Sequence, residues 1–269
     1  MNVGAPSREG EPRSLQARVR QLQSELAAER AACEEAKRQI GLKDELLAMI
    51  AHELRAPLGA ILGWAHMLRQ YGAQEEIARG LDVIEQSGQV QAKLIEDLLV
   101  ASRMASGGVR LDMALVDLPA LVDTAVQAMR PALADKEIGV SIGAARRMGP
   151  VRGDATRLQQ VLCNLLTNAL KFTPRGGSIA IALSSARGWA VVSVKDTGAG
   201  IAPQFLPHVF ERFRQDPSAA HAHGGLGLGL AIARHLVELH AGEITADSEG
   251  EGRGATFTVR LPQAEPARA

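Results

Sequence analysis

An apolar residue recurs at every seventh position from Val19 to Leu68, and this spacing commits the early part of the chain to a long amphipathic helix. The positions that hold this heptad register are Val19, Leu26, Cys33, Ile40, Leu47, Leu54, Ile61 and Leu68. The second apolar position of the heptad is weaker, because Glu29 and Lys43 interrupt it. Residues 14–45 are therefore interpreted as a marginal coiled coil that pairing with a second chain would stabilise. An amphipathic helix packed on its own domain is the alternative.

The same register places His52 on the helix face farthest from the apolar seam, so its imidazole is expected to face solvent. Glu53 follows at once and can accept a proton from the imidazole, which leaves a ring nitrogen free to attack a phosphorus atom. Pro57 removes one backbone donor and frees the carbonyl of Glu53, which predicts a looser helix just beyond the histidine. A surface histidine beside an ordinary proline kink is the competing interpretation.

A second amphipathic helix follows a break near Tyr71-Gly72 and ends before Gly107-Gly108, which predicts a helical hairpin. Two such chains would form a four-helix bundle with the histidines on its outside. The expected divisions are a disordered lead (1–13), a coiled-coil helix (14–45), a dimerisation and phosphoacceptor hairpin (46–106), a nucleotide-binding domain (109–262) and a tail (263–269).

From residue 109 onward the pattern becomes mixed. Helical periodicity appears at about 119–136 and 154–172, whereas alternating strand patterns appear at 179–183, 192–194 and 255–261. The predicted fold class is therefore a helical coiled coil and hairpin followed by an α+β sandwich. Its helices should cover one face of a largely antiparallel sheet.

Composition narrows the classes of function. Lys and Arg together number 30, as do Asp and Glu, so a sequence-independent nucleic-acid footprint is not expected. The two cysteines, Cys33 and Cys163, lie among apolar positions and have no metal-ligand spacing, which is typical of reduced thiols inside the cell. No apolar run approaches the ~20 residues of a membrane span. A cytoplasmic protein is expected.

Asn164, Asn168 and Lys171 share one polar stripe of the helix predicted over 154–172. Asparagine is a poor helix former, so two of them four residues apart beside a lysine suggest a specific role. Amide oxygens can bind Mg²⁺, which takes most of its other ligands from phosphates and water, and the lysine would neutralise phosphate charge. A solvated polar face is the alternative.

Asp196 closes a predicted strand and precedes Gly198 and Gly200. A carboxylate at the floor of an apolar cleft can accept a hydrogen bond from the amino group of adenine, and the glycines would allow close backbone approach to a ligand. The glycine run 224–229 leads into a helix predicted over 230–239, whose first N–H groups would face phosphate. It matches neither the Rossmann nor the P-loop template, and residues 216–223 are interpreted as a mobile lid.

In this order, these segments resemble the five conserved boxes of bacterial sensor histidine kinases of the two-component type. The resemblance covers residues 43–262, with the H box at 51–58, the N box at 164–172, the G1 box at 196–200, the F box at 210–213 and the G2 box at 225–229. Agreement of five boxes in order is a specific signal.

The resemblance implies that His52 is the phosphoacceptor, that it attacks the γ-phosphate of ATP, and that Glu53 is its activating base. It implies that Asn168 holds Mg²⁺, with Asn164 and Lys171 assisting at the phosphates. The other residues that it assigns to the nucleotide site are Asp196, which would bind adenine, Gly198, Gly200 and Phe213, and the lid glycines Gly225, Gly227 and Gly229.

The resemblance also implies partners. The phosphoryl group would pass to an aspartate of a response regulator, expected as a separate chain because no receiver domain follows Ala269, and the kinase would be a homodimer. No sensor domain precedes the coiled coil, so a partner acting on residues 1–45 is the expected source of the signal. In this branch of the family a Thr or Asn commonly occupies the fourth position after the histidine, where this chain has Ala56, which predicts that phosphatase activity toward the regulator is weak or absent.

Two alternatives from other classes remain open at this point. One is an ATPase or serine/threonine kinase on the same fold, with His52 incidental. The other is a non-catalytic phosphotransfer scaffold whose nucleotide site has decayed, although the intact Asn168 and Asp196 disfavour it.

Overall fold

The computed structural model describes residues 21, 29–30, 32–33, 50–68, 74–105, 110–143, 148–215 and 226–264. The chain divides into two compact units, residues 1–52 and residues 53–269, which are described separately. Most of the predicted coiled coil, the break at 71–72 and the predicted lid lie outside the described residues.

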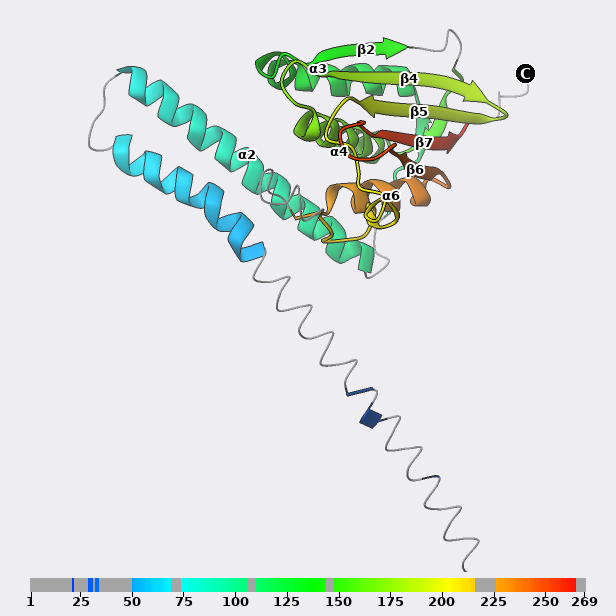
Figure 1. Cartoon of the computed structure of the whole chain (residues 1–269), viewed down its shortest axis with the longest axis horizontal. Coiled ribbons are helices and arrows are strands. Elements are labelled where there is room, and N and C mark those ends of the chain that lie inside the picture. Colours follow the sequence, from blue (N-terminus) through cyan, green and yellow to red (C-terminus); the bar gives the residue numbers. More distant parts are fainter. Residues whose placement is uncertain are drawn as a thin grey trace, which may run out of the picture. The chain divides into compact units, whose positions relative to one another are not determined.

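Two helices form the predicted hairpin (Figure 1). Residues 50–68 are helical without interruption, including the turn that contains Pro57, and α2 runs over Gln74–Ala105. A Cβ at Gly80 would lie 2.9 Å from Trp64 Cε3 and 3.0 Å from the Leu68 side chain. The missing side chain at Gly80 therefore lets the two helices approach each other closely.

The second part of the chain is built on a five-stranded sheet with the order β2, β4, β5, β7, β6 (Figure 1). Its strands are β2 (Gly139–Gly143), β4 (Ser178–Ala186), β5 (Trp189–Asp196), β6 (Glu243–Asp247) and β7 (Thr256–Pro262). All neighbours pair antiparallel except β2 and β4, which are parallel. A separate antiparallel ribbon joins β1 (Ala114–Val116) to β3 (Val151–Gly153).

The strands at 179–183, 192–194 and 255–261 were predicted and are confirmed, whereas β1, β2, β3 and β6 were missed. The missed strands have three to five residues and little apolar alternation. In β2 all five residues are partly or fully exposed. Such strands form because a neighbouring strand offers backbone partners, and this information does not lie in the local sequence.

Helices α3 (Leu118–Asp135), α4 (Ala155–Phe172) and α6 (Gly229–Leu239) cover one face of the sheet (Figure 1). A short 3₁₀ turn, η1 (Leu206–His208), follows β5. The predicted apolar stripe of α4 is confirmed, because all its members are buried: Leu158, Val161, Leu162, Leu165 and Ala169. The neighbouring polar stripe of α4, with Asn164, Asn168 and Lys171, lines a cleft.

The first turn of α4 is held by hydrogen bonds from distant segments. Asp154 is its N-cap and accepts from the N–H of Arg157 through Oδ1 (3.1 Å) and from the N–H of Asp112 through Oδ2 (3.0 Å). The backbone N–H of Asp154 donates to Nε2 of the buried His240 (2.9 Å), whose Nδ1 pairs with the Leu236 carbonyl (2.7 Å). A single tautomer of His240 satisfies both bonds and ties the end of α6 to the start of α4.

The last turn of α4 is held by one lysine. Lys136 Nζ lies 2.8 Å from the carbonyl oxygen of Leu170, and 3.2 Å from those of Lys171 and Thr173. A cation at the carboxyl end of a helix satisfies carbonyls that lack helical partners and complements the helix dipole.

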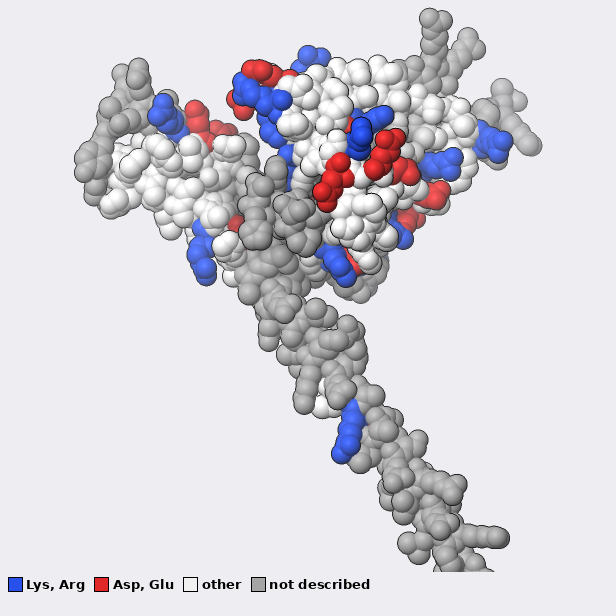
Figure 2. All heavy atoms as spheres, viewed as in Figure 1, with Lys and Arg blue, Asp and Glu red and all other residues white. Residues whose placement is uncertain are grey.

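Basic and acidic side chains are interspersed on the face of the molecule drawn in Figure 2.

Within the described parts of the chain, no helix combines the length and apolar character that a membrane crossing needs. Both cysteines are free thiols, with Cys33 exposed and Cys163 partly buried.

Replacing Lys136 with Met is expected to lower the free energy of unfolding by about 1.5–3 kcal/mol, because three helix carbonyls lose a charged donor. Chemical denaturation followed by circular dichroism measures the change. Lys195→Met is the matched control, since Lys195 is exposed on β5, and it should stay within about 0.5 kcal/mol of the parent. Equal effects of the two substitutions would contradict the assigned role.

Candidate functional site

A cleft of about 570 Å³ opens along the polar stripe of α4. Its volume lies in the range of small-molecule sites. Eight of the twelve predicted site residues line it: Glu53, Asn164, Asn168, Lys171, Asp196, Gly200, Gly227 and Gly229. Segments far apart in sequence are thus brought to one site, as the motif spacing predicts.

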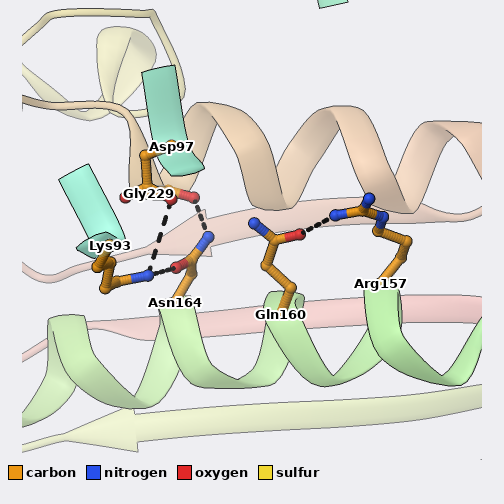
Figure 3. A network of polar contacts seen from close by, with 6 residues as sticks. All are labelled: Lys93, Asp97, Arg157, Gln160, Asn164 and Gly229. Carbon is orange, nitrogen blue, oxygen red and sulfur yellow. Dashed lines mark hydrogen bonds and ion pairs between the residues drawn. The ribbon is translucent and has the colours of Figure 1, made fainter. Parts of the chain in front are cut away.

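The two asparagines of α4 have different surroundings. Asn164 is buried; its amide nitrogen donates to the Gly229 carbonyl (3.0 Å) and its oxygen accepts from Lys93 Nζ (3.1 Å), as Figure 3 shows. Asn168 is half-buried and makes no hydrogen bond to any other described residue. Only the amide of Asn168 is therefore free to bind a ligand, whereas that of Asn164 joins α4 to the start of α6.

Lys171 stands at the end of the same stripe. Its Nζ lies 5.0 Å from the centre of the Phe172 ring. Burial lowers the pKa of Lys171, and the nearby carboxylate of Glu53 raises it in part. The influence of Glu53 indicates that the residue beside His52 lies within electrostatic reach of this lysine.

Asp196 is buried at the end of β5, and its two carboxylate oxygens differ. Oδ1 accepts from the N–H groups of Gly198 (2.8 Å) and Ala255 (3.3 Å). Oδ2 makes no hydrogen bond to the described residues, and Asp196 lines the cleft. Burial raises the pKa of Asp196, and the two N–H donors offset part of this effect. The backbone thus fixes the carboxyl group and leaves one oxygen for a ligand.

Two glycines of the cleft are required by the protein backbone itself. Gly200 has φ of +70°, and a Cβ there would lie 2.0 Å from the Gly250 carbonyl oxygen. Gly227 has φ of +64°, and its Cβ would lie 2.6 Å from the Arg214 carbonyl oxygen. The glycines were predicted to allow close approach of a ligand; the structure gives the additional reason that neighbouring loops pack against them.

Helix α6 begins at Gly229 without a side-chain cap from the described residues. Gly229 and Leu230 both line the cleft. The uncapped first turn leaves amide groups that can bind an anion.

Four predicted site residues do not line the cleft among the described parts of the chain. Gly198 donates a hydrogen bond from its N–H to Asp196 Oδ1 and so helps to fix this carboxylate. Phe213 has φ of +61° and donates its N–H to the Gly227 carbonyl (3.1 Å), so it shapes the adjoining loop. Gly225 lies outside the described residues, and His52 belongs to the first unit, where its helical position is exposed as predicted.

The sequence analysis missed two groups of cleft residues. Apolar walls come from loops and strands whose side chains show no pattern of a site: Ile201, Phe205, Val209 and Phe257. The hairpin contributes Val90, Lys93, Leu94 and Asp97 of α2. In sequence these are ordinary members of an amphipathic helix, and no local signal marks them. Arg214 was also missed, although a basic residue directly after the F box is a signal that could have been used.

The residues present fit a nucleotide and a hard cation. Asp196 offers a fixed acceptor, Lys171 a cation and Asn168 an uncommitted amide oxygen, the ligand type that Mg²⁺ accepts. No group of three His, Cys, Asp or Glu side chains with metal-binding geometry occurs among the described residues. A metal held mainly by phosphates, with Asn168 as a protein ligand, agrees with both observations.

Two families match this chain. Residues 42–107 match the family described as His Kinase A (phospho-acceptor) domain. Residues 153–265 match the family of histidine kinase-, DNA gyrase B-, and HSP90-like ATPases. The two matches coincide with the hairpin and with the sandwich that bears the cleft.

Individual relatives agree with these matches. Sensor protein DivL of Caulobacter vibrioides is 34% identical over 92% of this chain and 31% of its own length. The crystal structure of full-length ShkA in complex with AMPPNP has a TM-score of 0.62 at 30% identity and covers 83% of this chain and 46% of ShkA.

The histidine kinase ThkA, solved in complex with the response regulator protein TrrA, has a TM-score of 0.58 at 21% identity, covers 85% of this chain and 64% of its own, and shows the shared fold. The chain spans between 17% and 36% of the length of the curated relatives it matches.

Gly200→Ala is expected to destabilise the protein by more than about 2 kcal/mol, because it adds a backbone clash to the cost of a left-handed conformation. Gly176→Ala is the matched control: Gly176 has φ of +79° and open space around its Cβ, so it should cost about 1–2 kcal/mol. Denaturation curves of both variants separate the two contributions. A Gly200 variant no less stable than the Gly176 variant would contradict the packing contact.

Proposed function

The chain belongs to the histidine kinases, with a phospho-acceptor domain followed by an ATP-binding domain, and from this premise we propose that it phosphorylates its own His52 with ATP. The phosphoryl group then passes to an aspartate of a separate response regulator. The observation that carries the proposal is the composition of one cleft, in which Asp196, Asn168 and Lys171 occur together. An acceptor for the adenine amine, an amide ligand for a cation and a lysine for phosphate charge are the groups that ATP binding requires.

The proposed reaction uses the exposed imidazole of His52 as nucleophile. A ring nitrogen forms a bond to the γ-phosphorus while the bond to the bridging oxygen breaks and ADP leaves. Glu53 accepts the proton from the other ring nitrogen, so the imidazole gains no net charge as the new bond forms. Asp196 would bind adenine through Oδ2, and Lys171 would neutralise phosphate charge.

Mg²⁺ is proposed to accompany the nucleotide and to neutralise part of its phosphate charge when bound. Asn168 would hold it, because its amide oxygen is uncommitted. The amide of Asn164, by contrast, keeps Gly229 in place and acts at the phosphates only through the position of α6.

We also propose a homodimer, since the hairpin exposes large apolar side chains that a second copy would cover. Leu62, Leu81 and Leu99 are each more than half exposed. Pairing of two hairpins into a four-helix bundle would bury such residues. A partner that acts on residues 1–45 is proposed as the source of the signal. The reaction is placed in the cytoplasm, where ATP is supplied.

Incubation of the purified chain with γ-labelled ATP and Mg²⁺ is expected to give an acid-labile, alkali-stable label. His52→Gln should abolish the label because it removes the nucleophile, and Asn168→Ala should reduce it by about tenfold or more because it removes the proposed metal ligand. His66→Gln is the matched control, since His66 is also exposed on the same helix, and it should keep the label.

Label that persists in His52→Gln would place the acceptor elsewhere. Nucleotide binding without any label in the parent chain would favour an ATPase or another kinase on this fold. Absence of nucleotide binding would favour the non-catalytic scaffold.

Asp196→Asn is expected to weaken ATP binding by about 10- to 100-fold and to reduce discrimination against GTP, whose base lacks the 6-amino group. The Asn oxygen would keep the two N–H donors, so its amide nitrogen would face the adenine amine, donor against donor. Titration calorimetry measures both affinities. Asp247→Asn, at an exposed position on β6, is the control and should change neither.

The raised pKa of Asp196 also predicts a pH effect on this affinity. As pH falls, Asp196 takes up a proton at a higher pH than an ordinary aspartate and loses its acceptor character. The parent should therefore lose ATP affinity toward acid pH by more than Asp196→Asn does. Parallel pH profiles would contradict the assignment of Asp196.

A further inference from the structure

Lys93 of α2 joins the hairpin to the polar stripe of α4. Its Nζ donates to Asn164 Oδ1 at 3.1 Å and lies 3.7 Å from Asp97 Oδ1, one turn further along α2 (Figure 3). Asn164 is fixed from the other side by its bond to the Gly229 carbonyl. One ammonium group thus bridges the hairpin, α4 and, through Asn164, the first residue of α6.

The contact of α2 with α4 and α6 carries an energetic penalty, because it buries the carboxylate of Asp97. It is 8% exposed, and its Oδ1 is buried without a hydrogen bond, because 3.7 Å to Lys93 is too long for one. Burial raises the pKa of Asp97, which the charge of Lys93 offsets only in part. Val100 and Ala101 on the following turn are also buried, and α2 contacts α6. The hairpin packed against α4 and α6, here called docked, therefore carries a poorly solvated carboxylate that only Lys93 compensates among the described residues.

The docked hairpin also brings net negative charge to the cleft. Glu53 and Asp97 contribute two carboxylates and Lys93 one ammonium, and all three line it. A triphosphate entering the same cleft is repelled by the carboxylates of Glu53 and Asp97. Nucleotide and docked hairpin thus oppose each other electrostatically.

We propose that Lys93 ties the hairpin to α4 while the cleft is free of nucleotide, and that this contact lowers nucleotide affinity. The inference rests on the proposed nucleotide site and adds a regulatory contact to it. By linkage, a nucleotide that binds the undocked arrangement more tightly releases the hairpin, and any partner that loosens the hairpin favours nucleotide binding. Lys93 acts through Asn164 and Asp97 and is a positioning residue.

The test compares the full-length parent with Lys93→Ala and with Arg79→Ala, which removes a positive charge from an exposed position on the same helix. Calorimetry measures the Kd of the Mg²⁺ complex of AMPPNP. Lys93→Ala should bind at least about fivefold more tightly, since the competing contact is lost and Asp97 favours undocking. Arg79→Ala should stay within about twofold of the parent. Unchanged or weaker binding by Lys93→Ala overturns the proposal, and weaker binding would make Lys93 a direct phosphate ligand.

Hydrogen exchange of residues 94–105 without nucleotide provides an independent measurement. If residues 94–105 exchange faster in Lys93→Ala than in the parent and in Arg79→Ala, the result supports the proposal that Lys93 holds the hairpin on α4. Equal exchange in all three proteins overturns it. If the parent binds no nucleotide, the proposed function is wrong. The hydrogen-exchange comparison, which needs no nucleotide, still tests whether Lys93 holds the hairpin on α4.

Discussion

Helix α4 is held at both ends by groups that reach it from other parts of the chain, and the geometry of the cleft depends on this. At its start, Asp154 is fixed by its own cap bonds and by His240 at the end of α6. At its end, Lys136 binds three carbonyls. Between these anchors the apolar stripe is buried on the sheet, so the polar stripe can face only the cleft.

In this arrangement, chemically identical groups have different hydrogen-bond partners. Asn164 and Asn168 lie one turn apart on the same stripe, yet the first bonds to Gly229 and Lys93, whereas the second makes no hydrogen bond to any other described residue. The carboxylate of Asp196 is likewise divided: Oδ1 accepts from two backbone N–H groups, whereas Oδ2 makes no hydrogen bond to the described residues. A rigid frame that leaves a few polar atoms unused is how a cleft gains specificity before any ligand arrives.

Much of the fold followed from periodicity. The stripe of α4, the hairpin helices and the long strands β4, β5 and β7 have strong repeating patterns and were predicted correctly. The strands β1, β2, β3 and β6 were not, since three to five residues with little alternation carry too weak a pattern. The roles of Gly200 and Gly227 in packing were also invisible, because the crowding atoms come from Gly250 and Arg214.

By itself the sequence determined the elements, the apolar faces and the motifs, because a side chain's chemistry and its helical or strand period are local properties. It thereby determined the family and most of the motif residues that line the cleft. Only the tertiary structure decided which of two asparagines is free, and that Lys93 and Asp97 of α2 reach the cleft. Hydrogen-bond partners and desolvation arise between segments distant in sequence, so their outcome is fixed only when those segments pack together.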